Sequence, residues 1–308
     1  MLNHEKSSVY FRGNILPFEE ANLSICNTGF LYGLGVFTGM RINHNPATDK
    51  MYIFNPKPHF ERLVNAAKLM HYENFLANYT YDKFLQVIKE LVTANQIKEN
   101  TYVRFQIFTD ENKLTPKLVG YKDSTCAFLY PVGDYVSQTG MRCMVSSWTR
   151  VEDNSIPARA KINGSYVNSA LAKTIIVKQG YDEAIFLDKS GHVVEGSAEN
   201  IFLIKGDTFL TPPPYESILE GITRGTVIEL ARDLGYKVEE RPIDRSELYR
   251  VDEIFMTGTA AKIAPVVEVD SYLIGNGKPG KITTKIQELY SQISIGNVDN
   301  YLHWIEEV

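Results

Sequence analysis

The chain has 308 residues, of which 44% are hydrophobic and 22% charged, proportions typical of a globular protein with one large domain or two ordinary ones. A formal net charge of -5 at pH 7 indicates no basic surface for nucleic acid, and no apolar run is long enough to span a membrane. Three widely spaced cysteines and six scattered histidines predict reduced thiols, a cytoplasmic location and no metal site.

The first part of the chain predicts strands followed by amphipathic helices and further strands. A hairpin is expected around Gly13, and Pro131 to Asp134 ends the last strand of this part. We place the domain boundary there, while residues 110–122 carry no periodicity and are predicted to form a loop. Strands are expected over residues 8–12, 14–17, 51–54, 101–108 and 124–130, and helices over 57–72 and 81–97.

Two stretches of this part hold candidate functional residues. Gly33, Gly35 and Gly39 indicate a backbone that approaches something closely, but Thr38 stands where a dinucleotide-binding fingerprint needs its third glycine. In the strand over residues 101–108, one side carries three polar side chains. This side is either a solvated edge or the floor of a polar pocket. These side chains are Tyr102, Arg104 and Gln106.

The second part alternates strands with helices, which is typical of an α/β fold. Lys161 lies in a short polar turn before a helix that starts at Tyr166, where a lysine with a packed stem can form an imine. A surface lysine is the commoner case. Glu195 is expected in a connecting segment, and Gly221 begins a helix whose amides could seat a phosphate. Strands are expected over residues 141–148, 183–187, 201–204, 237–243, 253–256 and 263–269, and helices over 166–179 and 221–234.

Seven motifs follow one another along the chain: residues 29–41, 59–63, 102–104, 161 with 166, 195–196 with 199–200, 221–224 and 258–260. In this combination and order they resemble the fold-type IV pyridoxal-phosphate aminotransferases, and most of all the bacterial branched-chain amino acid aminotransferases. The resemblance covers nearly the whole chain. It implies an α+β small domain over residues 1–130, an interdomain loop over 131–137 and a larger, mixed and barrel-like β domain with helices over 138–308, which carries the lysine.

The resemblance assigns cofactor roles, with pyridoxal 5′-phosphate (PLP) as the cofactor. Lys161 matches the lysine that forms the Schiff base and moves the proton at the substrate Cα. Glu195 matches the carboxylate that faces the pyridine nitrogen, and Tyr166 matches the residue that hydrogen-bonds the ring 3-oxygen. The remaining cofactor residues are Arg62, Ile222, Thr223 and Thr259 at the phosphate and Leu219 against the ring.

Substrate roles follow from the same resemblance. Tyr102 and the backbone of Thr259 and Ala260 correspond to groups that hold the α-carboxylate, whereas Arg104 corresponds to the group that meets the distal carboxylate of glutamate. Tyr32 matches a residue that reaches the neighbouring subunit's site, which implies a homo-oligomer, at least a dimer. The apolar side-chain pocket is assigned to Phe37, Gly39 and Tyr135. The implied partners are small molecules, with no nucleic acid and no membrane.

The implied reaction moves an amino group from leucine, isoleucine or valine to 2-oxoglutarate. Thr38 stands where many relatives have glutamate, Val132 where a tryptophan is expected and Ala198 where a glycine is usual, and residues 110–121 show little likeness. These departures leave the substrate range open. The alternatives are a D-amino acid or (R)-amine transaminase, an aminodeoxychorismate lyase-like enzyme, and a non-enzymatic PLP-binding protein. Tyr166 and the turn at residues 258–260 argue against the D-amino acid and lyase activities, and Tyr102 with Arg104 argues against an (R)-amine activity. The complete set of lysine, glutamate and phosphate ligands argues against a non-enzymatic protein.

Overall fold

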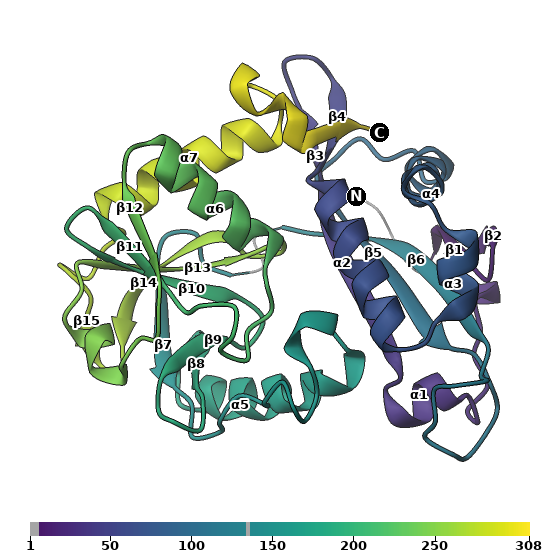
Figure 1. Cartoon of the computed structure of the whole chain (residues 1–308). Coiled ribbons are helices and arrows are strands. Elements are labelled where there is room, and N and C mark those ends of the chain that lie inside the picture. The colour runs from purple at the N-terminus through teal and green to yellow at the C-terminus, as the bar shows by residue number, and fades with distance from the viewer. Residues whose placement is uncertain (1–5, 134–135) are drawn as a thin grey trace. The chain divides into compact units, whose positions relative to one another are not determined.

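The computed structural model describes residues 6–133 and 136–308 (Figure 1). It divides into two compact units, the first made of Met1–Gly133, Ala160–Gly164 and Gln292–Val308, the second of Asp134–Arg159 and Ser165–Ser291. The domain boundary expected from the sequence, at residues 131–137, remains a prediction. The units differ from it in two segments, because the turn with Lys161 and the C-terminal segment pack with the first unit.

The first unit is built on a sheet of antiparallel strands in the order β16-β4-β3-β5-β6-β1-β2. The expected hairpin is confirmed as β1 and β2, whose strands pair antiparallel. The strands are β1 Ser8–Phe11, β2 Asn14–Pro17, β3 Gly35–Asn45, β4 Lys50–Phe54, β5 Thr101–Thr109, β6 Asp123–Pro131 and β16 Ile305–Glu307. The helices are α1 Thr28–Tyr32, α2 Pro56–Leu69, α3 Glu73–Asn78 and α4 Tyr81–Ala94.

Helices cover one face of this sheet, and α2 lies across β3 and β5 in Figure 1. The apolar stripes of α2 and α4 meet the sheet through aromatic contacts: the ring centroids of Phe60 and Phe84 lie 5.2 Å apart, and those of Phe84 and Phe105 lie 5.0 Å apart. Phe105 alternates along β5 with Arg104, so the polar side chains of this strand lie on the face that the helices leave open.

The second unit contains a closed ring of strands. Its sheet runs β12-β11-β10-β13-β14-β7-β8-β9, and β9 also pairs with β10, which closes the ring β10-β13-β14-β7-β8-β9. The barrel-like β domain expected from the resemblance is thereby confirmed. The strands are β7 Met141–Val145, β8 Glu183–Leu187, β9 Val193–Gly196, β10 Asn200–Lys205, β11 Thr208–Thr211, β12 Lys237–Glu240, β13 Glu253–Gly258, β14 Lys262–Val269 and β15 Tyr272–Leu273.

Buried aliphatic side chains fill this unit, including Cys143, Ile201 and Met256, each of which is fully or almost fully buried. Helices pack outside the ring, and α5 contacts β8 through Ala172 and Ile176. The helices are α5 Tyr166–Lys178, α6 Ile222–Asp233 and α7 Lys281–Ser294. Short 3₁₀ helices of the described residues lie at Phe18–Glu20, Ala158–Ala160, Asn163–Ser165, Arg245–Tyr249 and Asp299–Trp304.

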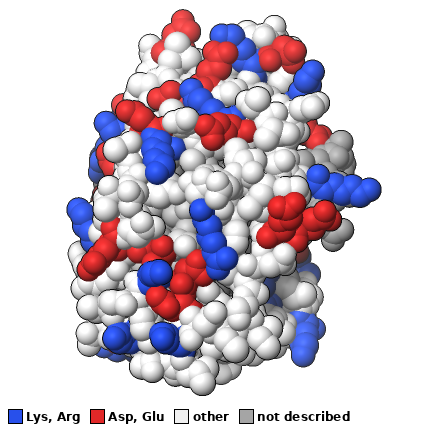
Figure 2. Space-filling model, turned by 90° about the vertical axis from the view of Figure 1, so that its right-hand side faces the viewer, with Lys and Arg blue, Asp and Glu red and all other residues white. Residues whose placement is uncertain are grey.

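One expected position was wrong: Glu195 lies in strand β9 and not in a connecting segment, because the main chain there pairs with both β8 and β10. On the face shown in Figure 2, lysine and arginine side chains lie interspersed with aspartate and glutamate. Among the described residues, no helix combines the length and the apolar character that crossing a bilayer requires.

Candidate active site

The open face of the first unit carries four of the predicted substrate residues. In the antiparallel register of β3 and β5, Gly39 stands opposite Arg104 and Phe37 opposite Gln106. Directly opposed residues share a face, so these side chains and that of Tyr102 project to the same side. The guanidinium carbon of Arg104 lies 3.5 Å from the centroid of the Phe37 ring, a cation–π contact. This arrangement, in which an apolar ring and a cation are in contact, is consistent with the polar side of β5 being the floor of a pocket.

Gly39 leaves room for Tyr102. A Cβ atom built at residue 39 would overlap the ring and hydroxyl of Tyr102 on the neighbouring strand. Glycine is therefore required here because of a close side-chain approach, as the glycine pattern of this segment indicated. The Tyr102 hydroxyl can lie over β3 only because residue 39 has no side chain.

Under the reaction that the resemblance implies, we expect Gly39→Ala to raise the KM for the amino acid by roughly 10-fold or more, because overpacking that displaces a side chain costs about 1–3 kcal/mol. Steady-state kinetics with leucine measures this. The control is Gly225→Ala, since a Cβ at Gly225 in α6 meets nothing within 4 Å. An unchanged KM in Gly39→Ala would show that Tyr102 does not hold the substrate.

The turn with Lys161 is fastened to β3. The amide of Phe37 donates to the carbonyl of Lys161 at 3.4 Å, and Val36 and Ile162 form an isolated antiparallel bridge. The Nζ atom of Lys161 lies 5.0 Å from the centroid of the Phe37 ring. Lys161 also has a φ of 48°, a left-handed conformation that costs a non-glycine residue about 1–3 kcal/mol.

Arg62 lies on α2, in the same unit as Lys161. Its Nη2 atom lies 3.5 Å from Nδ1 of His59, and His59 lies 2.7 Å from the hydroxyl of Thr38 on β3. The pKa of His59 is well below its usual range, because burial and the positive charges of Arg62 and Lys161 all oppose protonation. Arg62 and Lys161 are thus close enough to act on one imidazole.

In the second unit, three donors converge on the buried carboxylate of Glu195. Arg150 Nε donates to Oε1 at 2.7 Å, while Asn200 Nδ2 and the amide of Leu219 donate to Oε2 at 3.2 and 3.1 Å. Arg150 and Glu195 form an ion pair whose side chains are 8% and 6% exposed. Such an arrangement favours the ionised form of a carboxylate. The negative charge expected at Glu195 therefore has a structural basis.

Sequence reasoning missed Arg150 altogether and assigned no role to Asn200. Arg150 lies 45 residues before Glu195, in the segment that follows β7. It contacts Glu195 only because the fold brings this segment next to β9. The guanidinium also donates to Asn168 of α5 at 3.4 Å. The sequence did contain one signal for Asn200, because this residue belongs to the motif formed by residues 195–196 and 199–200.

The other predicted cofactor residues of this unit lie around Glu195. Across β9, β10 and β13, Glu195 pairs with Asn200, and Asn200 pairs with Thr257. The turn after Thr257 therefore starts at the same end of the ring as Glu195, and this turn contains Thr259 and Ala260. Both residues are half-buried.

Helix α6 starts three residues after Leu219. Its N-cap, Gly221, supplies no side-chain cap, and the first turn has no acidic residue, so the amides of Ile222 and Thr223 begin the helix at its positive end. Tyr166 is the first residue of α5, two residues before the Asn168 that contacts Arg150.

Four further residues were singled out from the sequence, and the structure describes three of them. Tyr135 lies outside the described residues. Tyr32, at the end of α1, is 39% exposed, and its hydroxyl donates to the carbonyl of Leu114 at 2.8 Å. Val132 is half-buried, and Ala198 is exposed in the turn between β9 and β10.

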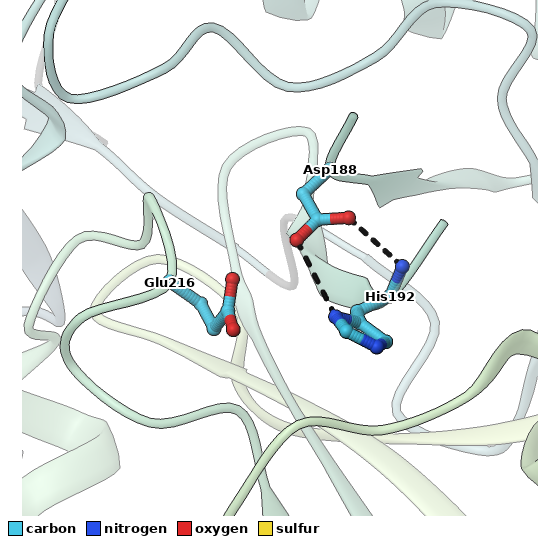
Figure 3. A group of neighbouring side chains, drawn as sticks. All are labelled: Asp188, His192 and Glu216. Atoms are coloured by element: carbon cyan, nitrogen blue, oxygen red, sulfur yellow. Dashed lines mark hydrogen bonds and ion pairs between the residues drawn. The ribbon is translucent and has the colours of Figure 1, made fainter. Parts of the chain in front are cut away.

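Asp188, His192 and Glu216 form a cluster in the second unit (Figure 3). Their potential ligand atoms lie within 4.8 Å of one another. Asp188 already accepts hydrogen bonds from the amides of Ser190 and His192, which orders the turn between β8 and β9. Burial and the adjacent Asp188 raise the pKa of Glu216. The hydrogen bonds of Asp188 thus stabilise the turn between β8 and β9.

The chain matches known proteins over most of its length. The family described as amino-transferase class IV matches residues 35–269. A probable branched-chain-amino-acid aminotransferase of Aquifex aeolicus (strain VF5) is 46% identical over 301 residues, 97% of this chain and 96% of that protein. The branched-chain-amino-acid aminotransferase of Escherichia coli (strain K12) is 32% identical over 315 residues, 100% of this chain and 99% of that protein.

Solved structures agree with these relatives. A branched-chain aminotransferase from Thermoproteus uzoniensis with norvaline has a TM-score of 0.93 at 38% identity, covering 98% of this chain and 99% of that one. A branched-chain amino acid aminotransferase from Thermobaculum terrenum, in its PLP form, has a TM-score of 0.93 at 31% identity, covering 99% of both chains. This chain belongs to the class IV aminotransferase family and has its fold, so the family expected from the seven motifs is confirmed.

Proposed function

We propose that this protein is a PLP-dependent aminotransferase that moves the amino group of leucine, isoleucine or valine to 2-oxoglutarate, giving branched-chain 2-oxo acids and L-glutamate. The observation that carries the proposal is the buried carboxylate of Glu195, ion-paired with Arg150 and bound by Asn200 and the Leu219 amide. The relatives named above, which span nearly the whole chain, support the reaction.

The residues present fit PLP. When bound, PLP supplies an electron sink for the negative charge that develops at the substrate Cα. The ionised Glu195 would hold a proton at the pyridine nitrogen, and the uncapped start of α6, with Thr223, would bind the phosphate. Arg62 would add a positive charge at the phosphate.

Lys161 would hold the cofactor through its amine and, once freed by the substrate, move the proton at Cα. Its carbonyl contact with the amide of Phe37 holds the backbone of the turn against β3 while the side chain acts. Tyr166 would hydrogen-bond the ring 3-oxygen and so orient the ring.

The pocket face on β3 and β5 suits two kinds of substrate. The Phe37 ring offers an apolar surface to a branched side chain, and Arg104, stacked on that ring, offers a cation to the distal carboxylate of glutamate. Tyr102, over Gly39, would hold the α-carboxylate together with Thr259 and Ala260. Tyr135 would complete the apolar side.

The assembly and the location are part of the proposal. Helix α1 exposes adjacent large side chains, with Phe30 67% and Leu31 41% exposed, next to Tyr32. Such a surface supports a homodimer in which Tyr32 reaches the partner's site. Cys26, Cys126 and Cys143 are free thiols, which supports a cytoplasmic location.

The absorbance spectrum of the purified protein, titrated with amino donors, tests the function. We expect L-leucine to remove the visible band of the bound cofactor and 2-oxoglutarate to restore it. D-alanine and an (R)-amine serve as controls that should leave the band unchanged. Bleaching by either control alone would replace the branched-chain assignment with one of the alternative transaminases, and the lack of any band after addition of PLP would refute the cofactor.

A further inference from the structure

Thr38 belongs to the segment that holds Gly33, Gly35 and Gly39. It lies on β3 between Phe37 and Gly39, and its side chain projects to the opposite face, toward α2. Thr38 is 0% exposed and His59 is 2% exposed. Their side chains meet at 2.7 Å, between Oγ1 and Nδ1. A buried hydroxyl and a buried imidazole therefore satisfy each other beneath the pocket face.

The same Nδ1 atom also faces Arg62, whose Nη2 lies 3.5 Å away. A guanidinium carries only donors, so Nδ1 is the acceptor toward it, and the hydroxyl of Thr38 must then donate to the same nitrogen. These contacts assign the ring proton to Nε2 of a neutral His59. Burial and the charges of Arg62 and Lys161 lower the pKa of His59, which agrees with a neutral ring.

We propose that Thr38 and His59 are positioning residues for Arg62, and that they set how tightly the protein binds the phosphate group of its cofactor. The proposal rests on the proposed function, which assigns Arg62 to that phosphate. Arg62 is one helical turn from His59 on α2, and a long arginine side chain has many rotamers. A neutral acceptor held by Thr38 selects the rotamers that keep the guanidinium beside it, whereas a charged imidazolium would repel it.

The test compares two ligands that differ only in the phosphate. The dissociation constants of PLP and of pyridoxal are measured by fluorescence titration of the full chain after its cofactor has been removed. In Thr38→Val, which keeps the side-chain shape and loses the hydroxyl, we expect PLP to bind about 2- to 10-fold more weakly, the range for one neutral hydrogen bond. The constant for pyridoxal should not change, and Thr38→Ser should restore PLP binding.

Arg62→Met separates this inference from the proposed function. If Arg62→Met leaves the ratio of the PLP constant to the pyridoxal constant unchanged, Arg62 does not bind the phosphate, so its assignment in the proposed function and this inference both fail, while the transaminase reaction itself is judged by the absorbance titration. If Arg62→Met raises the ratio of the PLP constant to the pyridoxal constant and Thr38→Val does not, or if Thr38→Val weakens both ligands equally, the inference alone is overturned. In the double variant we expect no loss beyond that of Arg62→Met, since Thr38 acts through Arg62; additive losses would contradict it.

Discussion

Lys161→Ala is expected to reduce kcat for transamination by about 10⁴-fold or more, because the variant loses both the amine that holds the cofactor and the group that moves the Cα proton. Multiple-turnover assays with leucine and 2-oxoglutarate measure the loss. The fold should survive, since alanine adds no bulk to the turn, and a circular dichroism spectrum checks this.

Lys189→Ala is the matched control for this loss. The side chain of Lys189 is 74% exposed, and its ion pair with Glu152 at 2.9 Å lies on the surface, so its removal should change kcat by less than about 2-fold. Sustained turnover by Lys161→Ala, at a rate near that of the control, would refute the assignment of this lysine.

Glu195→Gln is expected to lower kcat by roughly 10²- to 10³-fold, because the amide removes the negative charge that would hold a proton at the pyridine nitrogen. It also leaves Arg150 buried without its counter-ion, and breaking one side of a buried ion pair costs about 3–5 kcal/mol. Kinetics and thermal unfolding of the cofactor-loaded protein are both needed, since the variant loses activity and stability together.

Arg150→Met separates the two effects. It breaks the same ion pair and leaves the charge of Glu195 in place, so its melting temperature should fall about as far as that of Glu195→Gln. Its kcat should fall much less, because Asn200 and the Leu219 amide still bind the carboxylate. Equal losses of kcat in the two variants would mean that Glu195 has a structural role only.

Local patterns predicted the elements that present one apolar face. Helices α2 and α4 and strand β5 alternate between buried and exposed positions with regular periods, and that alternation is visible in the residues themselves. Strand β3 was not predicted as a strand, because ten of its eleven residues are buried and its glycines look like turn residues. Strand β16 pairs with β4 across most of the chain, and no local pattern records such a pairing.

The sequence by itself determined the family, because its seven motifs stand in a fixed order along the chain, and it led to the proposal of a lysine, a glutamate and an arginine at the site. Only the tertiary structure decided which residues support those groups. Arg150 holds Glu195 across 45 positions, and Thr38 holds His59 across 21. These contacts depend on strand register and helix placement, which arise from packing the whole chain, so they have no signature within any one segment.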